Sequence, residues 1–329
     1  METAVPVLRI EDLKVTFSHG QLKAFALRGI NLSFKRDEIH GLVGESGSGK
    51  TVTSTCIMGL LPSPPARIES GRILYDGKDL LQLSEAEMRT YRGRKIAMIF
   101  QEPAKYLNPA FKIGEQIIEM VRLHLGMSRQ AAEERAKELL HLVGLGKDGR
   151  VLDSFPHELS GGMKQRAMIA IAISCNPDFL IADEPTTALD VTLQLQILRL
   201  LKKLQSLQRM SVLFISHDLG IVYEIADAVS VIYAGKIVES AKKENLFKNS
   251  LHPYTKLLML SSPNAKKRGK RLTTIPGQVL DATETPRGCS FAPRCPLARD
   301  RCYAEDPELT AYTEGHTVAC HFAGETWKI

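Results

Sequence analysis

Hydrophobic and polar positions alternate in short blocks along most of the chain. Short apolar runs and every-second-residue patterns predict strands, whereas apolar residues spaced three and four apart predict helices. The expected strands are 8–17, 30–34, 38–44, 94–100, 178–183, 211–217 and 228–238, and the expected helices are 50–61, 128–145, 192–207 and 220–226. Strands that alternate with helices in this way are typical of an α/β fold with a largely parallel sheet and helices on its faces.

The segment 128–145 has the clearest helical pattern. One face carries an apolar stripe formed by Ala132, Ala136, Leu139, Leu140 and Val143. Glu133 and Lys137 form an i,i+4 pair of opposite charge, and Gly144 is suited to end the helix. We expect the helical part at approximately 102–165 to be a subdomain inserted into an α/β domain that spans 1–262.

The alternation stops after residue 262. Residues 263–288 are first basic and then rich in Pro and Thr, which is typical of a linker, and a cysteine-rich segment follows. The expected second unit is therefore a small one at 263–329. No internal repeat occurs, so the chain carries one copy of the α/β domain.

Composition limits the classes of protein that fit. Of the 329 residues, 44% are hydrophobic and 24% are charged, as in a soluble globular protein. The net charge of +6 is mildly basic, but the only dense basic run, 266–271, lies in the expected linker, so nucleic-acid binding is not expected. No apolar run approaches 18 residues, and the first residues lack a basic start followed by an apolar core. We expect neither a membrane span nor a signal peptide.

The stretch GESGSGKT at 44–51 fits the pattern G-x-x-x-x-G-K-[ST] between a predicted strand and a predicted helix. Its glycines allow backbone N–H groups to surround phosphates, and the helix N-terminus adds positive potential. The expected nucleotide-binding residues are Gly44, Glu45, Ser46, Gly47, Ser48, Gly49, Lys50 and Thr51. Lys50 would reach the β- and γ-phosphates, and the Thr51 hydroxyl would ligate Mg²⁺.

Two further motifs have chemistry of the same kind. The apolar strand FLIADEP ends in Asp183, placed to hold the Mg²⁺ shell, and Glu184, placed as general base for an attacking water. The stretch ELSGGMKQR combines Ser160, a natural helix N-cap, with two glycines at a helix start, which is a second anion-binding device. One chain has no evident need for two such devices, so the second is expected to serve the nucleotide of a partner.

At this point the chain resembles the ATP-binding-cassette (ABC) ATPases. GESGSGKT, LSGGM, FLIADEP, ALD and ISHD occur in that family's order and spacing, and the resemblance covers about residues 8–262. It implies a P-loop NTPase cassette with an inserted helical subdomain, with ATP and Mg²⁺ as cofactors. Met163 stands where the family signature usually has Gln, a position beyond the residues that would meet phosphate.

The resemblance also implies roles for single residues. Phe17 would stack on adenine. Gln101 would lie near Mg²⁺ and the attacking water, and His217 would contact the γ-phosphate. Contacts across a dimer of cassettes are implied for Ser160, Gly161, Gly162 and Asp190.

A narrower resemblance extends into the tail. YLNPAFKIGEQI, DEPTTALDVTLQLQIL, NSLHPYTKLLMLSSP and RGCSFAPRCP together resemble the ATP-binding subunits of dipeptide and oligopeptide importers. The partners implied are a second, non-identical ABC ATPase subunit, two transmembrane permease subunits and an extracytoplasmic solute-binding protein, at the cytoplasmic face of the inner membrane. Alternatives are a machine of this type that imports nickel, glutathione or a glycoside, or a soluble ABC ATPase without a transport role. The soluble alternative would normally have tandem cassettes or a long coiled-coil insertion, which this sequence lacks.

Six cysteines remain to be explained. Cys56 and Cys175 lie in apolar helical contexts and are expected to be core residues. The other four lie in the tail without the tight C-x₂₋₄-C pairs of common zinc sites, and Cys295-Pro296 has only a weak likeness to ferredoxin-type clusters. Nearby arginines, at 287, 294, 299 and 301, would offset the charge of a thiolate-ligated centre. The resemblance implies a [4Fe–4S] cluster, with zinc as second choice and reduced thiols as third, on Cys289, Cys295, Cys302 and Cys320.

Overall fold

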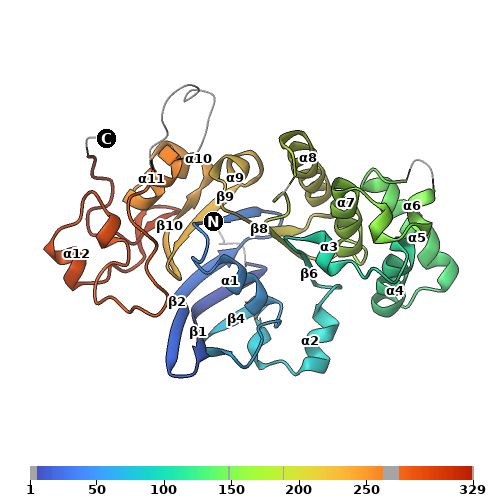
Figure 1. Cartoon of the computed structure of the whole chain (residues 1–329), viewed down its shortest axis with the longest axis horizontal. Coiled ribbons are helices and arrows are strands. Elements are labelled where there is room, and N and C mark those ends of the chain that lie inside the picture. Colours follow the sequence, from blue (N-terminus) through green and yellow to red (C-terminus); the bar gives the residue numbers. More distant parts are fainter. Residues whose placement is uncertain (1–5, 147–148, 188, 262–273, 328–329) are drawn as a thin grey trace. The chain divides into compact units, whose positions relative to one another are not determined.

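A computed structural model describes residues 6–146, 149–187, 189–261 and 274–327 of the chain (Figure 1). The chain divides into two compact units. Unit 1 consists of Met1–Leu81 and Phe214–Ile329, and unit 2 of Gln82–Leu213. Each unit is described by itself, and the division between them falls within the strand β8, Ser211–Ser216.

Unit 1 is built mostly of strands. Its strands are β1 (Leu8–His19), β2 (Leu22–Phe34), β3 (Ile39–Val43), β4 (Ala66–Tyr75), β5 (Lys78–Asp79), β9 (Ala228–Tyr233), β10 (Lys236–Lys242), β11 (Thr310–Thr313) and β12 (His316–Val318). Its helices are α1 (Lys50–Ile57), α9 (Leu219–Ile225), α10 (Lys243–Lys248), α11 (Pro253–Ser261) and α12 (Asp300–Ala304), with a short 3₁₀ turn at Ala292–Arg294.

The strands of unit 1 form two groups. The antiparallel sheet has the order β2-β1-β4-β5, and its long blue strands are evident in Figure 1. The other group has the order β11-β12-β10-β9-β3, in which only β3 and β9 pair in parallel. β3 is buried along its whole length, as expected for a central strand with both faces covered.

Unit 2 is mainly helical. Its helices are α2 (Glu85–Tyr91), α3 (Pro103–Tyr106), α4 (Ile113–Leu125), α5 (Arg129–Leu142), α6 (Arg150–Asp153), α7 (Gly161–Ala172) and α8 (Val191–Gln208), with a 3₁₀ turn at Pro156–Glu158. Two of its strands, β6 (Ile96–Ile99) and β7 (Phe179–Asp183), form a parallel pair. α4, α5 and α7 pack on one another, as the green part of Figure 1 shows.

The pattern at 128–145 predicted its helix correctly. All five residues of the apolar stripe are buried, and Lys137 pairs with Glu133 at 3.3 Å. The helix ends at Leu142, and Gly144 follows the C-cap residue Val143 with a positive φ of 82°. The parallel pairs confirm the α/β expectation, whereas the antiparallel sheet of β1, β2, β4 and β5 was not expected.

The prediction of a single strand at 228–238 was wrong. This segment forms an antiparallel hairpin of β9 and β10 that turns at Ala234 and Gly235. Both residues have positive φ, 44° and 77°, which is the backbone of the tight turns that suit the strand twist of a hairpin. Alternation of apolar residues continues on both sides of the turn, and so the pattern alone does not show the reversal.

The tail is joined to the strands of unit 1. β12 pairs with β10, and β11 pairs with β12, so the last part of the chain extends the group that contains β3. Glu239 of β10 is fully buried and accepts hydrogen bonds from the Leu251 and His252 N–H groups. The same carboxylate lies 2.8 Å from Nε2 of His316 in β12. These contacts bind the tail strand and the start of α11 to one buried carboxylate.

Within the described ranges, no helix combines the length and the apolar composition that a membrane crossing requires.

Candidate functional site

The loop at 44–51 connects β3 to α1 and depends on its glycines in different ways. Gly49, the N-cap of α1, has φ 106°, and a Cβ there would lie 2.7 Å from the Leu27 side chain and 2.8 Å from the Ala26 carbonyl. A Cβ on Gly44 would lie only 2.2 Å from the carbonyl oxygen of Ile232. Gly47 has φ 78° but faces open space. The two outer glycines therefore allow close packing, and the middle one supplies the turn.

The ammonium group of Lys50 lies inside this loop. Its Nζ donates hydrogen bonds to the carbonyl oxygens of Gly44 and Glu45 at 2.8 and 2.9 Å, and the residue is buried. The Glu45 carbonyl also accepts a hydrogen bond from the Ser48 N–H at 3.2 Å. The loop thus curls around a lysine at the N-terminus of a helix, which is the arrangement that binds phosphate groups.

Unit 2 brings two of the predicted catalytic residues together. Glu184 follows β7, and its Oε2 accepts hydrogen bonds from Nε2 of Gln101 at 3.0 Å and from the Thr187 hydroxyl at 2.9 Å. Glu184 has a positive φ of 45°. Strained backbone conformations of this kind are found mainly at functional sites. Asp183, at the end of β7, is buried. Thr187 is a contact of the predicted base that sequence analysis missed, although it lies only three residues away.

The serine of the LSGGM stretch is the N-cap of α7, as predicted. Its hydroxyl accepts a hydrogen bond from the Met163 N–H at 3.4 Å. Asp190 is likewise the N-cap of α8 and accepts from the N–H groups of Thr192 and Leu193, both at 3.0 Å. Ser160 and Asp190 therefore each cap the start of a helix.

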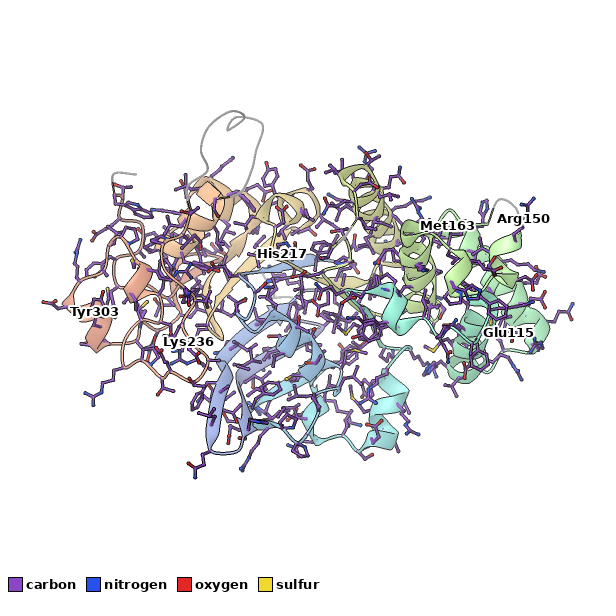
Figure 2. All side chains as sticks on the ribbon, viewed as in Figure 1. Glu115, Arg150, Met163, His217, Lys236 and Tyr303 are labelled. Atoms are coloured by element: carbon purple, nitrogen blue, oxygen red, sulfur yellow. The ribbon has the colours of Figure 1, made fainter. Side chains whose placement is uncertain are left out.

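Two further predicted residues lie near the ends of strands. Phe17 is half-buried in β1, where it pairs with Ala24 of β2 and Ala66 of β4. His217, labelled in Figure 2, directly follows β8 and is exposed. Asp218 next to it caps α9 by accepting from the N–H groups of Gly220 and Ile221.

The four tail cysteines line one cavity. Its lining includes all four cysteines together with His252 and Phe291. The pKa of Cys289 is raised to about 11 and that of Cys295 to about 12, mainly by burial and in smaller part by the neighbouring tail cysteines. Among the described residues, no group of three or more His, Cys, Asp or Glu side chains is placed to hold a metal ion. Cys56 and Cys175 are buried core residues, as predicted.

Three of the four tail arginines are paired with carboxylates, which differs from the expectation that they offset a thiolate-ligated centre. Arg299 contacts Glu325 at 2.5 Å, and Arg301 contacts Glu305 at 2.8 Å. Arg294 contacts Glu45, the second residue of the phosphate loop, at 2.8 Å. In these three arginines, the positive charge that we expected to offset a thiolate-ligated centre is paired with a carboxylate instead.

The Arg294–Glu45 pair is the largest feature of the site that the sequence did not predict. Burial acts to lower the pKa of Arg294, but hydrogen bonds to Glu45 and Tyr233 raise it, and the net pKa is above its ordinary value. The guanidinium is therefore firmly charged. The two partners are 249 residues apart, so no local pattern could have indicated their contact.

Three features define a P-loop ATPase of the ABC class. They are the loop around Lys50, the strand β7 with the acids Asp183 and Glu184 at its end, and the LSGGM stretch whose serine caps α7. The comparisons with known proteins agree. Residues 27–187 match the family "ABC transporter", and residues 238–302 match "Oligopeptide/dipeptide transporter, C-terminal region". A solved dimeric ATP-binding cassette, MJ0796, in a post-hydrolysis state with ADP and phosphate, superposes with a TM-score of 0.65 at 28% identity, over 72% of this chain and 98% of that one.

Curated relatives narrow the class. The chain is 47% identical to a probable peptide ABC transporter ATP-binding protein of Sinorhizobium fredii, over 97% of this chain and 96% of the relative. It is 46% identical to the oligopeptide transport ATP-binding protein OppD of Bacillus subtilis (95% and 87%) and to the dipeptide transport ATP-binding protein DppD of the same organism (95% and 94%). The chain belongs to the family of ATP-binding subunits of peptide ABC transporters, and it is an ABC transporter ATPase.

Proposed function

We propose that this chain hydrolyses ATP to drive uptake of dipeptides or oligopeptides through a membrane ABC importer. The observation that carries this proposal is the identity of 46–47% to relatives named for peptide transport, which extends through the tail. The solute itself is selected elsewhere, on the permease and binding-protein subunits. Nickel, glutathione or a glycoside as solute would leave the role of this chain unchanged.

In the proposed reaction, the loop at 44–51 holds the phosphates and Glu184 removes a proton from the attacking water. The hydrogen bonds from Gln101 and Thr187 orient the Glu184 carboxylate, which supports this role. Thr51, Gln101 and Asp183 supply oxygen atoms of the kind that Mg²⁺ prefers, and the ion would offset phosphate charge. Phe17 and His217 are assigned to the adenine ring and the γ-phosphate.

Replacing the base tests this proposal. Glu184→Gln should lower the ATPase rate of the assembled transporter by at least about 100-fold and leave ATP affinity nearly unchanged, because it removes the base but not the phosphate loop. The matched control is Glu138→Gln on α5, an exposed surface glutamate of the same unit. Near-normal turnover of the Glu184→Gln transporter would exclude Glu184 as the base.

The partners proposed are a second, non-identical ATPase subunit, two permease subunits and an extracytoplasmic binding protein, with this chain at the cytoplasmic face of the inner membrane. Ser160, Gly161, Gly162 and Asp190 would contact the nucleotide or the loop of the second ATPase. Mass determination of the purified complex, combined with a peptide-uptake assay, tests the assembly. An active complex with two copies of this chain and no second ATPase would contradict the heteromeric arrangement. Full ATPase activity without any hydrophobic partner would favour a soluble ABC ATPase.

The tail cysteines are proposed to hold a [4Fe–4S] cluster. The support is that Cys289, Cys295, Cys302 and Cys320 line one cavity and offer four thiols, and His252 and His321 line it as well. A cluster takes one thiolate at each of its four iron corners, so the sulfurs need not converge on a single ion as they do at zinc. Such a centre would staple a segment that has few large apolar residues of its own.

Metal and sulfide analysis of anaerobically purified protein tests the tail. We expect iron and acid-labile sulfide in the wild-type chain, less iron in Cys302→Ser, and unchanged iron in the control Cys175→Ser. Stoichiometric zinc without sulfide would make the tail a zinc site. Absence of any metal would leave four reduced thiols.

A further inference from the structure

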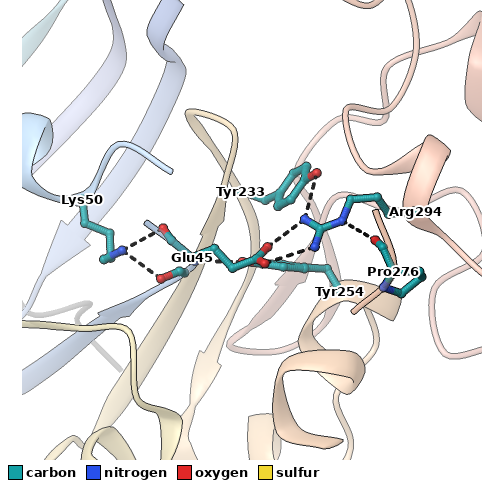
Figure 3. A network of polar contacts seen from close by, with 7 residues as sticks. Glu45, Lys50, Tyr233, Tyr254, Pro276 and Arg294 are labelled. Atoms are coloured by element: carbon teal, nitrogen blue, oxygen red, sulfur yellow. Dashed lines mark hydrogen bonds and ion pairs between the residues drawn. The ribbon is translucent and has the colours of Figure 1, made fainter. Parts of the chain in front are cut away.

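Glu45 is held through every polar group that it has. Its N–H donates to the Tyr254 hydroxyl at 3.0 Å, and its carbonyl accepts from Lys50 and from the Ser48 N–H. Both carboxylate oxygens accept from Arg294, at 2.8 and 3.1 Å. Figure 3 shows this chain of contacts from Lys50 through Glu45 to Arg294.

Arg294 is buried and fixed on all sides. Its side chain is only 5% exposed, whereas that of Glu45 is 28% exposed. Besides the two-pronged contact with Glu45, its Nε donates to the Pro276 carbonyl at 2.8 Å, and one terminal nitrogen lies 3.4 Å from the Tyr233 hydroxyl. A guanidinium that makes two parallel bonds to a carboxylate fixes its direction as well as its position.

Aromatic rings pack closely around the pair. The rings of Tyr233, Tyr254 and Phe291 pack against one another with centroids 4.7–5.2 Å apart. Phe291 also lines the cysteine cavity, and Arg294 immediately precedes Cys295, which lines it too. The Arg294–Glu45 pair therefore joins the cysteine segment to the phosphate loop, and packed aromatic rings surround this connection.

The pair has two consequences for the loop. Rotation of Glu45 would displace a carbonyl that holds Lys50, so Arg294 fixes the lysine indirectly. It also neutralises a carboxylate that would otherwise add negative charge to a loop that binds a polyanion. We propose that Arg294, supplied by the cysteine segment, is a positioning residue of the phosphate loop that acts through Glu45. This inference rests on the proposed role of the loop in binding ATP.

Replacement of Arg294 in the assembled transporter tests the inference. We expect Arg294→Gln to raise the Kd for ATP and the KM by about 10- to 100-fold, the size of a lost charged hydrogen-bonded contact, with a smaller change in kcat. Arg294→Lys keeps the charge but not the two-pronged geometry, so it should restore ATP affinity only in part. The matched control is Arg301→Gln, which removes an exposed ion pair of the same segment and should change ATP affinity less than about two-fold.

A double-mutant cycle separates positioning from a general loss of structure. If Arg294 acts through Glu45, the losses of Glu45→Gln and Arg294→Gln should not add, and the double variant should bind ATP better than Arg294→Gln alone. Additive losses, or unchanged ATP affinity in Arg294→Gln or Arg294→Lys, would overturn the inference. Should Arg294→Gln not fold, partial loss of affinity in the lysine variant supports the inference and no loss overturns it.

Lys50→Ala distinguishes this inference from the proposed function. If Lys50→Ala abolishes ATP binding while Arg294→Gln binds normally, the loop binds ATP and only the role of Arg294 is wrong. If Lys50→Ala binds ATP as tightly as the wild-type chain, the assignment of the loop itself fails.

Discussion

Alanine at two glycines of the phosphate loop should have separable effects on stability and on nucleotide binding. At Gly49, alanine would adopt φ 106°, which costs about 1–3 kcal/mol of backbone strain. Its Cβ would also lie 2.8 Å from the Ala26 carbonyl, and that backbone cannot move without disturbing β2. Overpacking of this kind costs a further 1–3 kcal/mol or so. The free energy of unfolding should therefore fall by about 2–6 kcal/mol.

Gly47 is the matched control within the same loop. Its φ of 78° lies near the left-handed helical region, and no atom lies within 4 Å of an added Cβ. Only backbone strain applies, about 1–2 kcal/mol. Because the open space at Gly47 belongs to the loop that we assign to phosphate, alanine there should still weaken ATP binding.

Thermal unfolding and ATP binding should be measured on both variants in parallel. We expect the unfolding midpoint to fall by about 5–15 °C for Gly49→Ala and by about 2–6 °C for Gly47→Ala. ATP affinity should fall in both. Equal midpoints would show that the close contact at Gly49 relaxes at no cost, and unchanged ATP affinity in Gly47→Ala would place the phosphates away from it.

Two further predictions concern the attachment of the tail. Glu239→Ala removes a fully buried acceptor of two backbone N–H groups and the partner of His316. It should destabilise the fold by about 3–5 kcal/mol and speed amide exchange in β12. The exposed control Glu305→Ala should leave the free energy of unfolding nearly unchanged, and equal effects of the two variants would contradict this account. Burial lowers the pKa of His252 from 6.5 to about 4, although the charge of Glu239 acts to raise it. As the pH falls, His252 is therefore protonated in the unfolded chain before it is protonated in the folded one. The contribution of neutral His252 to the free energy of unfolding should therefore be fully present above about pH 6.5 and fall by about 3 kcal/mol toward pH 4. Denaturant titration at several pH values measures this change. His252→Gln should make the dependence on pH flatter, and an unchanged slope would contradict the reasoning.

Local patterns were sufficient for the loop and for some of the elements, whereas the strands β4, β5, β11 and β12 were not predicted. The helix α5, the buried strand β3 and the N-caps at Ser160 and Asp190 each depend on residues within a few positions of one another. Periodicity and capping chemistry are properties of such short stretches, and so they can be determined from the sequence. The family resemblance implies that Gln101 and Glu184 both lie near the attacking water, and in the structure their side chains are hydrogen-bonded to each other.

The turn at Ala234–Gly235 shows where local patterns fail. Apolar alternation continues from β9 into β10, and only the positive φ of both turn residues reverses the chain. The antiparallel sheet β2-β1-β4-β5 was missed for a related reason: strand patterns indicate extended backbone but not the direction or the identity of the partner strand.

The sequence by itself determined the class of ATPase. It did so through the phosphate loop, the two acids at the end of β7 and the LSGGM stretch, because each is a contiguous motif whose chemistry depends on its own residues. Only the tertiary structure decided that the tail adds strands to β10, that its four cysteines line one cavity, and that Arg294 holds Glu45. These contacts join residues tens to hundreds of positions apart. The free energy that selects them comes from burial and charge pairing in the folded chain, for which the order of residues along the chain has no local signal.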